Sequence, residues 1–166
     1  MTRATEPRRV FLVTIVMIVA CLAGVTFATS VGAASWNGIE PLKTRREDVV
    51  KILGQPTSES PDGALRFSVS GGTVQISFVN EKFVTAKRLK PELAGTVLEI
   101  VLQHEHSSDT AESMKLLTNR AFVRDDVRNI SVFRNVKDGV VYTFIDGNLK
   151  TTRYTFADGQ LFRSRH

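Results

Sequence analysis

Two histidines in the middle of the chain are the residues with the clearest capacity for chemistry. His104 and His106 lie two positions apart, and residues at that spacing on a β-strand point to the same face. Imidazole nitrogens are common zinc ligands, so the two rings could hold one cation, with Asp109 and Glu112 nearby in sequence. A catalytic metal normally has three protein ligands, and the alternative is a polar strand end that runs into a solvated turn. Both interpretations stay open.

Other catalytic arrangements are missing from the sequence. It contains no serine in a G-x-S-x-G turn, no phosphate-binding loop and no dinucleotide-binding glycine pattern. Its single cysteine, Cys21, falls in an N-terminal apolar segment. Neighbouring carboxylates such as Glu47 and Asp48 point in different directions on a helix and complement its dipole instead. We therefore expect no enzyme activity and no cofactor.

The first 34 residues have the pattern of an export signal. Three arginines precede an apolar run over residues 10–28, and small residues follow at 31–34. The run approaches the roughly 20 residues that cross a membrane, so an uncleaved anchor formed by residues 10–28 is the alternative. A lipidated Cys21 and twin-arginine export are minor alternatives. We expect an exported protein, periplasmic or extracellular.

The remaining residues, 35–166, have the length of a single domain. A chain of that size buries about two thirds of its unfolded surface. The net charge of the whole chain is +5, and arginines of the signal account for part of it. So small a surplus gives no indication of a nucleic-acid partner. The expected partner is another protein of the cell envelope, with the membrane contacted only through an uncleaved signal or a lipidated Cys21.

Residues 44–53 predict a helix with both ends marked. Thr44 has the character of an N-cap, and Glu47, three residues later, completes a capping box. Gly54 and Pro56 end the helix. Three apolar positions at helical spacing form the buried stripe: Val49, Ile52 and Leu53.

Most of the remaining chain alternates between apolar and polar residues, which predicts antiparallel strands. The expected strands cover 65–69, 74–78, 97–102, 130–136, 140–144 and 154–156, with 81–89 as a strand or loop and 160–162 as a short last strand. A second short helix is expected over 110–117. Short helices beside an antiparallel β-meander make an α+β fold. The halves 36–104 and 107–162 each have one helix ahead of a meander, so two αβ units in tandem stay an open alternative.

The residues around the first helix resemble two known families. Gly38, Thr44, Val49, Leu53, Gly54 and Pro56 are similar to the G-x-[ST]-x-x-x-V-x-x-x-L-G-x-P signature of the SmpA/OmlA (BamE-like) family. The longer pattern that opens W-x-G-I-x-P-L at Trp36 resembles a family of uncharacterised exported bacterial proteins. The first resemblance covers about 45 residues, and the second covers most of residues 35–166.

The BamE-like resemblance implies an αβ unit of the kind that is paired in tandem in β-lactamase inhibitor proteins. In those relatives the unit is an envelope adaptor or a protein-binding module. The other family carries no activity that can be transferred. Together these resemblances imply a non-catalytic protein-binding or structural role, with a small-ligand or metal-binding periplasmic module at His104 and His106 as the alternative.

Two further sets of residues could contact a partner. Trp36, the sole tryptophan, either covers the core as a lid or presents an exposed aromatic anchor. The basic residues Lys82, Lys87 and Arg88 surround Phe83, which suits either an edge strand protected by its charges or a surface for an anionic lipid or polyanion.

Overall fold

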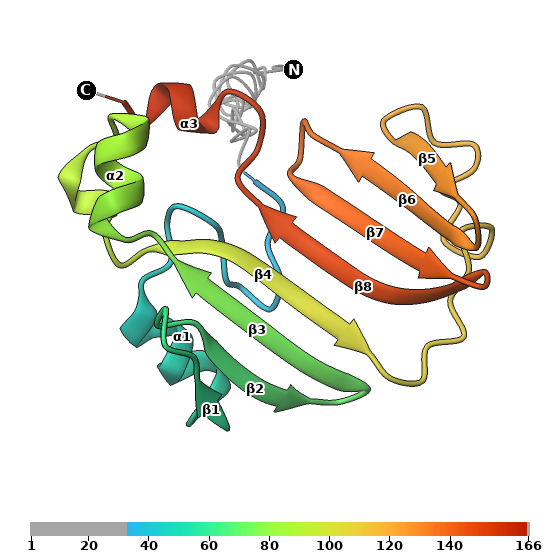
Figure 1. The fold of residues 1–166 in the computed structure, drawn as a ribbon, viewed down its shortest axis with the longest axis horizontal. Helices are drawn as coiled ribbons and strands as arrows, with labels where there is room; N and C mark the ends of the chain where they lie inside the picture. Colours follow the sequence, from blue (N-terminus) through green and yellow to red (C-terminus); the bar gives the residue numbers. More distant parts are fainter. Residues whose placement is uncertain (1–32, 166) are drawn as a thin grey trace, which may run out of the picture. The chain divides into compact units, whose positions relative to one another are not determined.

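Eight antiparallel strands form one sheet in the computed structural model, which describes residues 33–165 (Figure 1). The strand order is β1-β2-β3-β4-β8-β7-β6-β5. Two four-strand meanders therefore meet where β4 pairs with β8. The strands are β1 (Ser58–Glu59), β2 (Leu65–Val69), β3 (Gly72–Phe78), β4 (Val97–His104), β5 (Val123–Val127), β6 (Ile130–Asn135), β7 (Val140–Ile145) and β8 (Asn148–Thr155).

Within residues 33–165 four short helices accompany the sheet, which makes the fold α+β as expected. They are α1 (Arg46–Leu53), α2 (Glu81–Lys87), η1 (Pro91–Leu93) and α3 (Gln160–Arg163). None of the helices within residues 33–165 has the length and apolar character needed to cross a membrane. Residues 1–32 of the predicted export signal, Cys21 among them, lie outside the described residues.

Helix α1 ends as predicted but begins differently. Its N-cap is Arg45, which makes no side-chain capping bond. The hydroxyl of Thr44 instead accepts a hydrogen bond from the Glu40 amide at 2.8 Å. The predicted capping box is therefore wrong, because the Thr44 hydroxyl is used in the turn that precedes the helix. Gly54 has the left-handed φ of +82° and donates its amide to the Val50 carbonyl at 2.9 Å.

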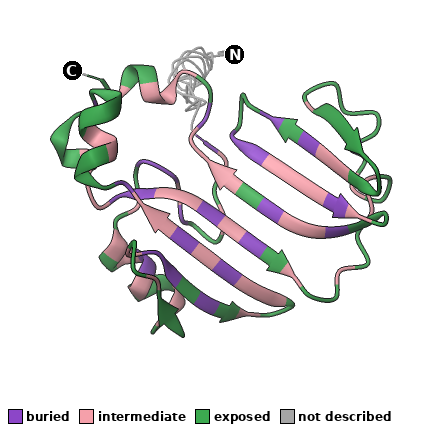
Figure 2. Cartoon of the chain, viewed as in Figure 1, coloured by how far each residue is buried: buried purple, intermediate pink, exposed green. Residues whose placement is uncertain are grey.

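The core consists of two apolar clusters, one on each meander. The first joins α1 to β2, β3 and β4 and contains Ile39, Val49, Leu65, Phe67, Val74, Ile76, Val97, Ile100 and Leu102. The second contains Leu116, Phe133, Phe144 and Leu149, with Met114 and Phe122 packed against it. Helix α1 thus covers the first meander, and the segment 110–122 covers the second. Figure 2 shows the buried positions alternating along the central strands.

The predicted stripe of α1 is right at two of its three positions. Val49 is fully buried and Leu53 packs against the first cluster. Ile52, in contrast, is 44% exposed, and Val50 takes its place against the core. The helix presents the face that contains positions 49, 50 and 53 to the sheet, so Ile52 falls at its margin.

Residues 81–89, predicted as a strand or loop, contain helix α2 instead. The Asn80 side chain accepts a hydrogen bond from the Phe83 amide at 2.8 Å and so caps the helix. Arg88 ends it in the left-handed conformation, with φ at +54°. The short strand expected over 160–162 is also a helix, α3.

The helix predicted over 110–117 is wrong. The amides of Thr110 and Ser113 each donate to the other residue's hydroxyl, at 3.0 and 3.1 Å. Lys115 then adopts a left-handed φ of +55°. Such local side-chain bonds compete with helical ones, so the segment forms turns. It still places Met114 and Leu116 against the second cluster.

Candidate functional site

Among the described residues no helix packs across one face of the sheet, although Leu161 of α3 borders it after β8, and we call this the open face. Alternate residues of each strand point away from the two core clusters and onto this face. The strand registers align Arg66, Gln75, Val101, Arg153, Val141 and Arg134 across β2, β3, β4, β8, β7 and β6. Figure 1 shows strands β3 to β8 unobstructed by any helix.

The open face over β5, β6 and β7 carries a group of apolar side chains, with the Asp125–Arg134 ion pair among them. Six β-branched residues lie there in register, and we call them the β5–β7 patch: Val123, Val127, Ile130, Val132, Val141 and Ile145. Val123 is 64% exposed and Val127 66% exposed. The first meander differs, because its open face carries Arg66, Ser68, Thr73, Gln75 and Gln103. The two halves of the sheet therefore offer surfaces of different chemistry.

Charged residues of β5 and β6 are paired on both sides of the sheet. On the open face, within the β5–β7 patch, Arg134 forms an ion pair with Asp125. On the opposite face Arg124 contacts Asp126 at 2.9 Å and lies 5.5 Å over the Phe133 ring. The Ser131 hydroxyl donates to Asp126 at 2.6 Å, and this bond, together with Arg124, holds the pKa of Asp126 below its usual range. Asp126 is therefore a charged acceptor at neutral pH.

A hollow of about 340 Å³ adjoins the patch on the open face. Strands β6, β7 and β8 form part of its lining through Arg134, Val141 and Arg153, and the chain after β8 closes it with Phe156 and Leu161. The hollow thus combines apolar walls with two guanidinium groups. Each guanidinium already has a carboxylate partner, Asp125 for Arg134 and Glu99 for Arg153, and Asp158 also lines the hollow. The apolar walls are therefore the part of the hollow that suits a partner side chain.

A second groove, of about 370 Å³, lies where β4 ends, and its lining includes Trp36, Leu53, Gly72 and His104. The His104 Nε2 lies 2.9 Å from the Thr152 Oγ1. Burial lowers the pKa of the His104 ring, and the charge of Asp109 opposes that shift. A neutral imidazole is the form that binds metals.

The two candidate metal ligands, His104 and His106, lie in different local conformations. Strand β4 ends at His104, and His106 lies exposed in the bend that follows. The strand alternation behind the predicted shared face therefore does not extend to His106. Within residues 33–165 no three His, Cys, Asp or Glu side chains are grouped to hold a metal. A site that uses His104 and His106 stays a prediction.

Trp36 packs against the first core cluster, the placement expected of a lid. It exchanges backbone hydrogen bonds with Ile39, at 2.8 and 3.0 Å, and so closes the turn ahead of α1. Its half-buried ring also contributes to the groove beside His104.

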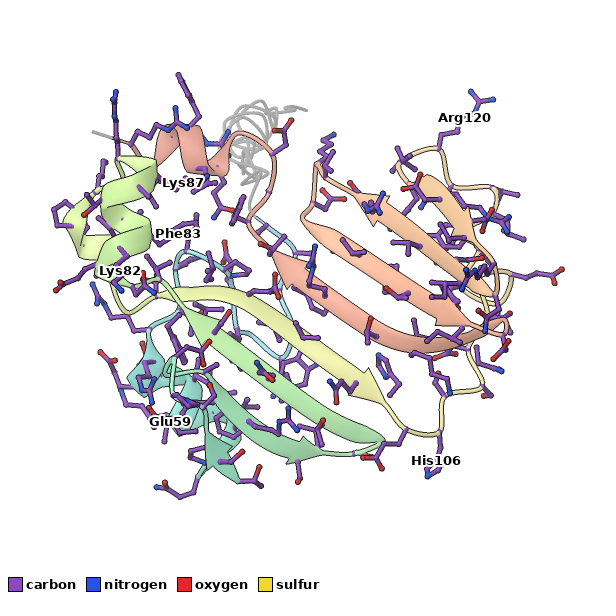
Figure 3. The ribbon with its side chains drawn as sticks, in the orientation of Figure 1. Glu59, Lys82, Phe83, Lys87, His106 and Arg120 are labelled. Carbon is purple, nitrogen blue, oxygen red and sulfur yellow. The ribbon has the colours of Figure 1, made fainter. Side chains whose placement is uncertain are left out.

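The basic residues around Phe83 lie on helix α2 or at its end, so their interpretation as a charged edge strand is wrong. Lys82, Lys87 and Arg88 are exposed, while Phe83 is half-buried. Figure 3 places Lys82, Phe83 and Lys87 at the end of the sheet where β4 begins, whereas His106 follows the other end. Binding of an anionic lipid or polyanion by this helix stays a prediction.

Comparisons with known proteins add little to this geometry. No protein-family model and no curated protein matches the sequence. The chain is similar to a solved structure of a DUF4309 family protein, YjgB, from Bacillus subtilis, with a TM-score of 0.49 and 11% sequence identity over 75% of this chain and 88% of that chain. At that level of similarity we transfer neither fold nor function from it.

Sequence reasoning missed strand β5 and therefore the patch. Its residues are Val123-Arg124-Asp125-Asp126-Val127. Three consecutive charged residues do not show the alternation of apolar and polar residues that predicts a strand. Two signals were available. Val123, Asp125 and Val127 alternate at the period of a strand, and Arg128-Asn129 is a two-residue connection of the kind that joins hairpins.

Proposed function

We propose that this chain is a non-catalytic, exported protein of the cell envelope that binds another protein through the open face of its sheet. One observation carries the proposal: Val123 and Val127 are about two-thirds exposed and lie in register with four further β-branched residues. Exposed apolar side chains grouped in this way are found at interaction sites of soluble proteins.

The surroundings of the β5–β7 patch support a protein partner. The Asp125–Arg134 ion pair lies among its apolar side chains, and the hollow lined by Arg134 and Arg153 adjoins it. Apolar side chains combined with arginine are common in protein interfaces. The export signal predicted for residues 1–34 supports a partner in the envelope or outside the cell.

The strand order also supports the proposal that the chain consists of two αβ units in tandem. It reads the same from either edge, because β1 to β4 and β5 to β8 are both meanders and their last strands pair. Each meander is covered by the segment that precedes it, α1 in one and residues 110–122 in the other. If the two units are related, residues 110–122 cover the second meander as α1 covers the first, although they form turns and not a helix.

Site-specific photo-crosslinking in the native envelope tests the proposal. A photoreactive residue at Val141, inside the patch, should capture one specific protein repeatedly. The same residue at Ser68, on the polar half of the open face, is the matched control and should capture less of it. Val127→Ser and Ile145→Ser should weaken the capture at Val141. Capture of no repeated partner, or equal capture at Ser68, would count against this surface.

The groove beside His104 favours a second candidate, a small-ligand or metal-binding module. Its lining brings Trp36, Asn37, Gln103 and His104 together around about 370 Å³. Measuring metal content, and the melting temperature with and without Zn²⁺ and EDTA, tests the metal form of this proposal. A purified protein without metal, whose melting temperature neither reagent changes, would contradict it.

A further inference from the structure

The two edges of the sheet are unequal. Edge strand β1 has two residues, whereas edge strand β5 has five, all of them exposed. Natural sheets protect long edges with charged side chains, prolines or bulges. Strand β5 contains no proline, and its pairing with β6 is regular along its whole length. Its three charged residues are of both signs, so they disfavour most strands but admit one whose charges are complementary. It is therefore an edge available for further pairing.

The hairpin fixes which backbone groups of β5 face outward. Val127 and Ile130 flank the two-residue turn, in which Arg128 has a φ of +55°. The residues that flank such a turn form a hydrogen-bonded pair. Hydrogen-bonded and non-bonded pairs alternate along antiparallel strands, so Asp125 also bonds toward β6. The amides and carbonyls of Arg124 and Asp126 consequently point to the free edge.

The sequence of β5 is complementary to itself when two copies run antiparallel. With Asp125 on a two-fold axis, Arg124 faces Asp126 of the second copy, and Asp126 faces its Arg124. Both residues have outward backbone groups, so the register satisfies the hydrogen-bonding pattern as well as the charges. Val123 then meets Val127 of the second copy at each end of the paired segment.

We propose that β5 binds a second copy of this chain, antiparallel and centred on Asp125, to form a sheet that continues through both copies. This interface uses the backbone edge of β5, whereas the proposed partner protein binds the side chains of the β5–β7 patch. It extends that patch, because Val123 and Val127 of both copies adjoin on the open face. The two Asp125 carboxylates meet at the axis, and each is already paired with its own Arg134.

Disulfide trapping tests the register directly. In the full chain carrying Cys21→Ser, an Asp125→Cys substitution introduces the sole cysteine. Non-bonded antiparallel neighbours lie about 4.5 Å apart between Cα atoms, within the range of a disulfide. Val127→Cys is the matched control, because the Cα atoms of position 127 in the two copies would be about 14 Å apart along the strands. We expect a disulfide dimer for Asp125→Cys and none for Val127→Cys.

Charge exchange tests the proposed partners. Arg124→Asp and Asp126→Arg each turn two attractive pairs of the dimer into repulsive ones, so each should lower dimer yield in the Asp125→Cys background about tenfold. The double variant exchanges the charges and should restore the yield. All three substitutions are at exposed positions, and far-UV circular dichroism will verify that the variants fold.

Four results would overturn the proposal. The first is no disulfide dimer of Asp125→Cys, and the second is equal trapping at position 127. The third is failure of the double exchange to restore what each single exchange removes. A disulfide formed with a different protein in place of a second copy would also overturn it, because the proposal commits to self-association.

Discussion

His104 on β4 reaches Thr152 on β8, with its Nε2 2.9 Å from the Thr152 Oγ1. The two strands are the last of their meanders, so this bond crosses the seam between the two halves of the sheet. Thr152 is buried at 4% exposure. The bond therefore couples the protonation of one histidine to the packing of the seam.

Stability should fall with acid because of His104. Burial lowers the pKa of its ring below the usual 6.5, so the native state favours the neutral form and the unfolded chain binds the proton more readily. The contribution of His104 to the free energy of unfolding is thus fully present above about pH 6.5 and is lost as the pH falls below that value. Urea unfolding between about pH 5 and 8 should show this loss in the wild type, and a smaller loss in His104→Gln. His106→Gln is the control, and an equal change of slope in it would refute the assignment.

The packing of α1 should depend on Val49 and not on Ile52. Val49 is fully buried in the first cluster, so Val49→Ala should lower the free energy of unfolding by about 2 kcal/mol. Ile52 is 44% exposed and does not belong to the first cluster, so Ile52→Ala should change the free energy of unfolding by about 0.5 kcal/mol or less. Urea titration of both variants gives the comparison, and equal costs would mean that the helix presents another face to the sheet.

Gly139 should tolerate no side chain. Its φ is +72°, and a Cβ there would run into the carbonyl oxygen of Thr155 on β8. Gly147 has a similar φ, of +80°, with open space around its Cβ position. Gly147→Ala should therefore cost about 1 kcal/mol for the left-handed backbone alone. Gly139→Ala should cost clearly more, since β7 and β8 must also move apart. Thermal unfolding of the two variants measures the difference, which should vanish if the two strands are not in this register.

Arg46 should stabilise the first meander through several contacts at once. Its guanidinium donates to the Gly63 carbonyl at 2.7 Å, contacts Glu59 at 2.8 Å and lies 5.1 Å over the Phe78 ring. A lysine cannot reproduce this fork, so Arg46→Lys should cost about 1–2 kcal/mol. Arg66→Lys is the matched control, because Arg66 makes one exposed bond to Gln75. Arg66→Lys should change the free energy of unfolding by about 0.5 kcal/mol or less, and urea unfolding of both variants measures the difference.

Local patterns in the sequence predicted the elements whose signals are local. The alternation of Leu65, Phe67 and Val69 and the turn at Ser70-Gly71 specify the β2–β3 hairpin, and Gly54 specifies the end of α1. Helix α2 was missed because its apolar residues, Phe83 and Val84, are adjacent and only half-buried. Adjacent apolar residues fit neither the strand nor the helix period clearly.

The candidate site could not be predicted from sequence, because it depends on which strands become neighbours. Val123, Ile130 and Val141 form a patch only when β5, β6 and β7 pair in one register. Likewise, nothing near His104 in the sequence indicates Thr152 as its partner. Both relationships follow from the pairing of elements that are distant or were not recognised.

The pairing of β4 with β8 also has a consequence for the order of folding. It joins residues such as His104 and Thr152, which are 48 positions apart. The hairpins within each meander close over short loops, apart from β3–β4, whose connection contains α2 and η1. Closing a longer loop costs more entropy, so the hairpins can form before the two meanders dock. Substitutions at the β4–β8 contact should then mainly accelerate unfolding and leave the refolding rate nearly unchanged.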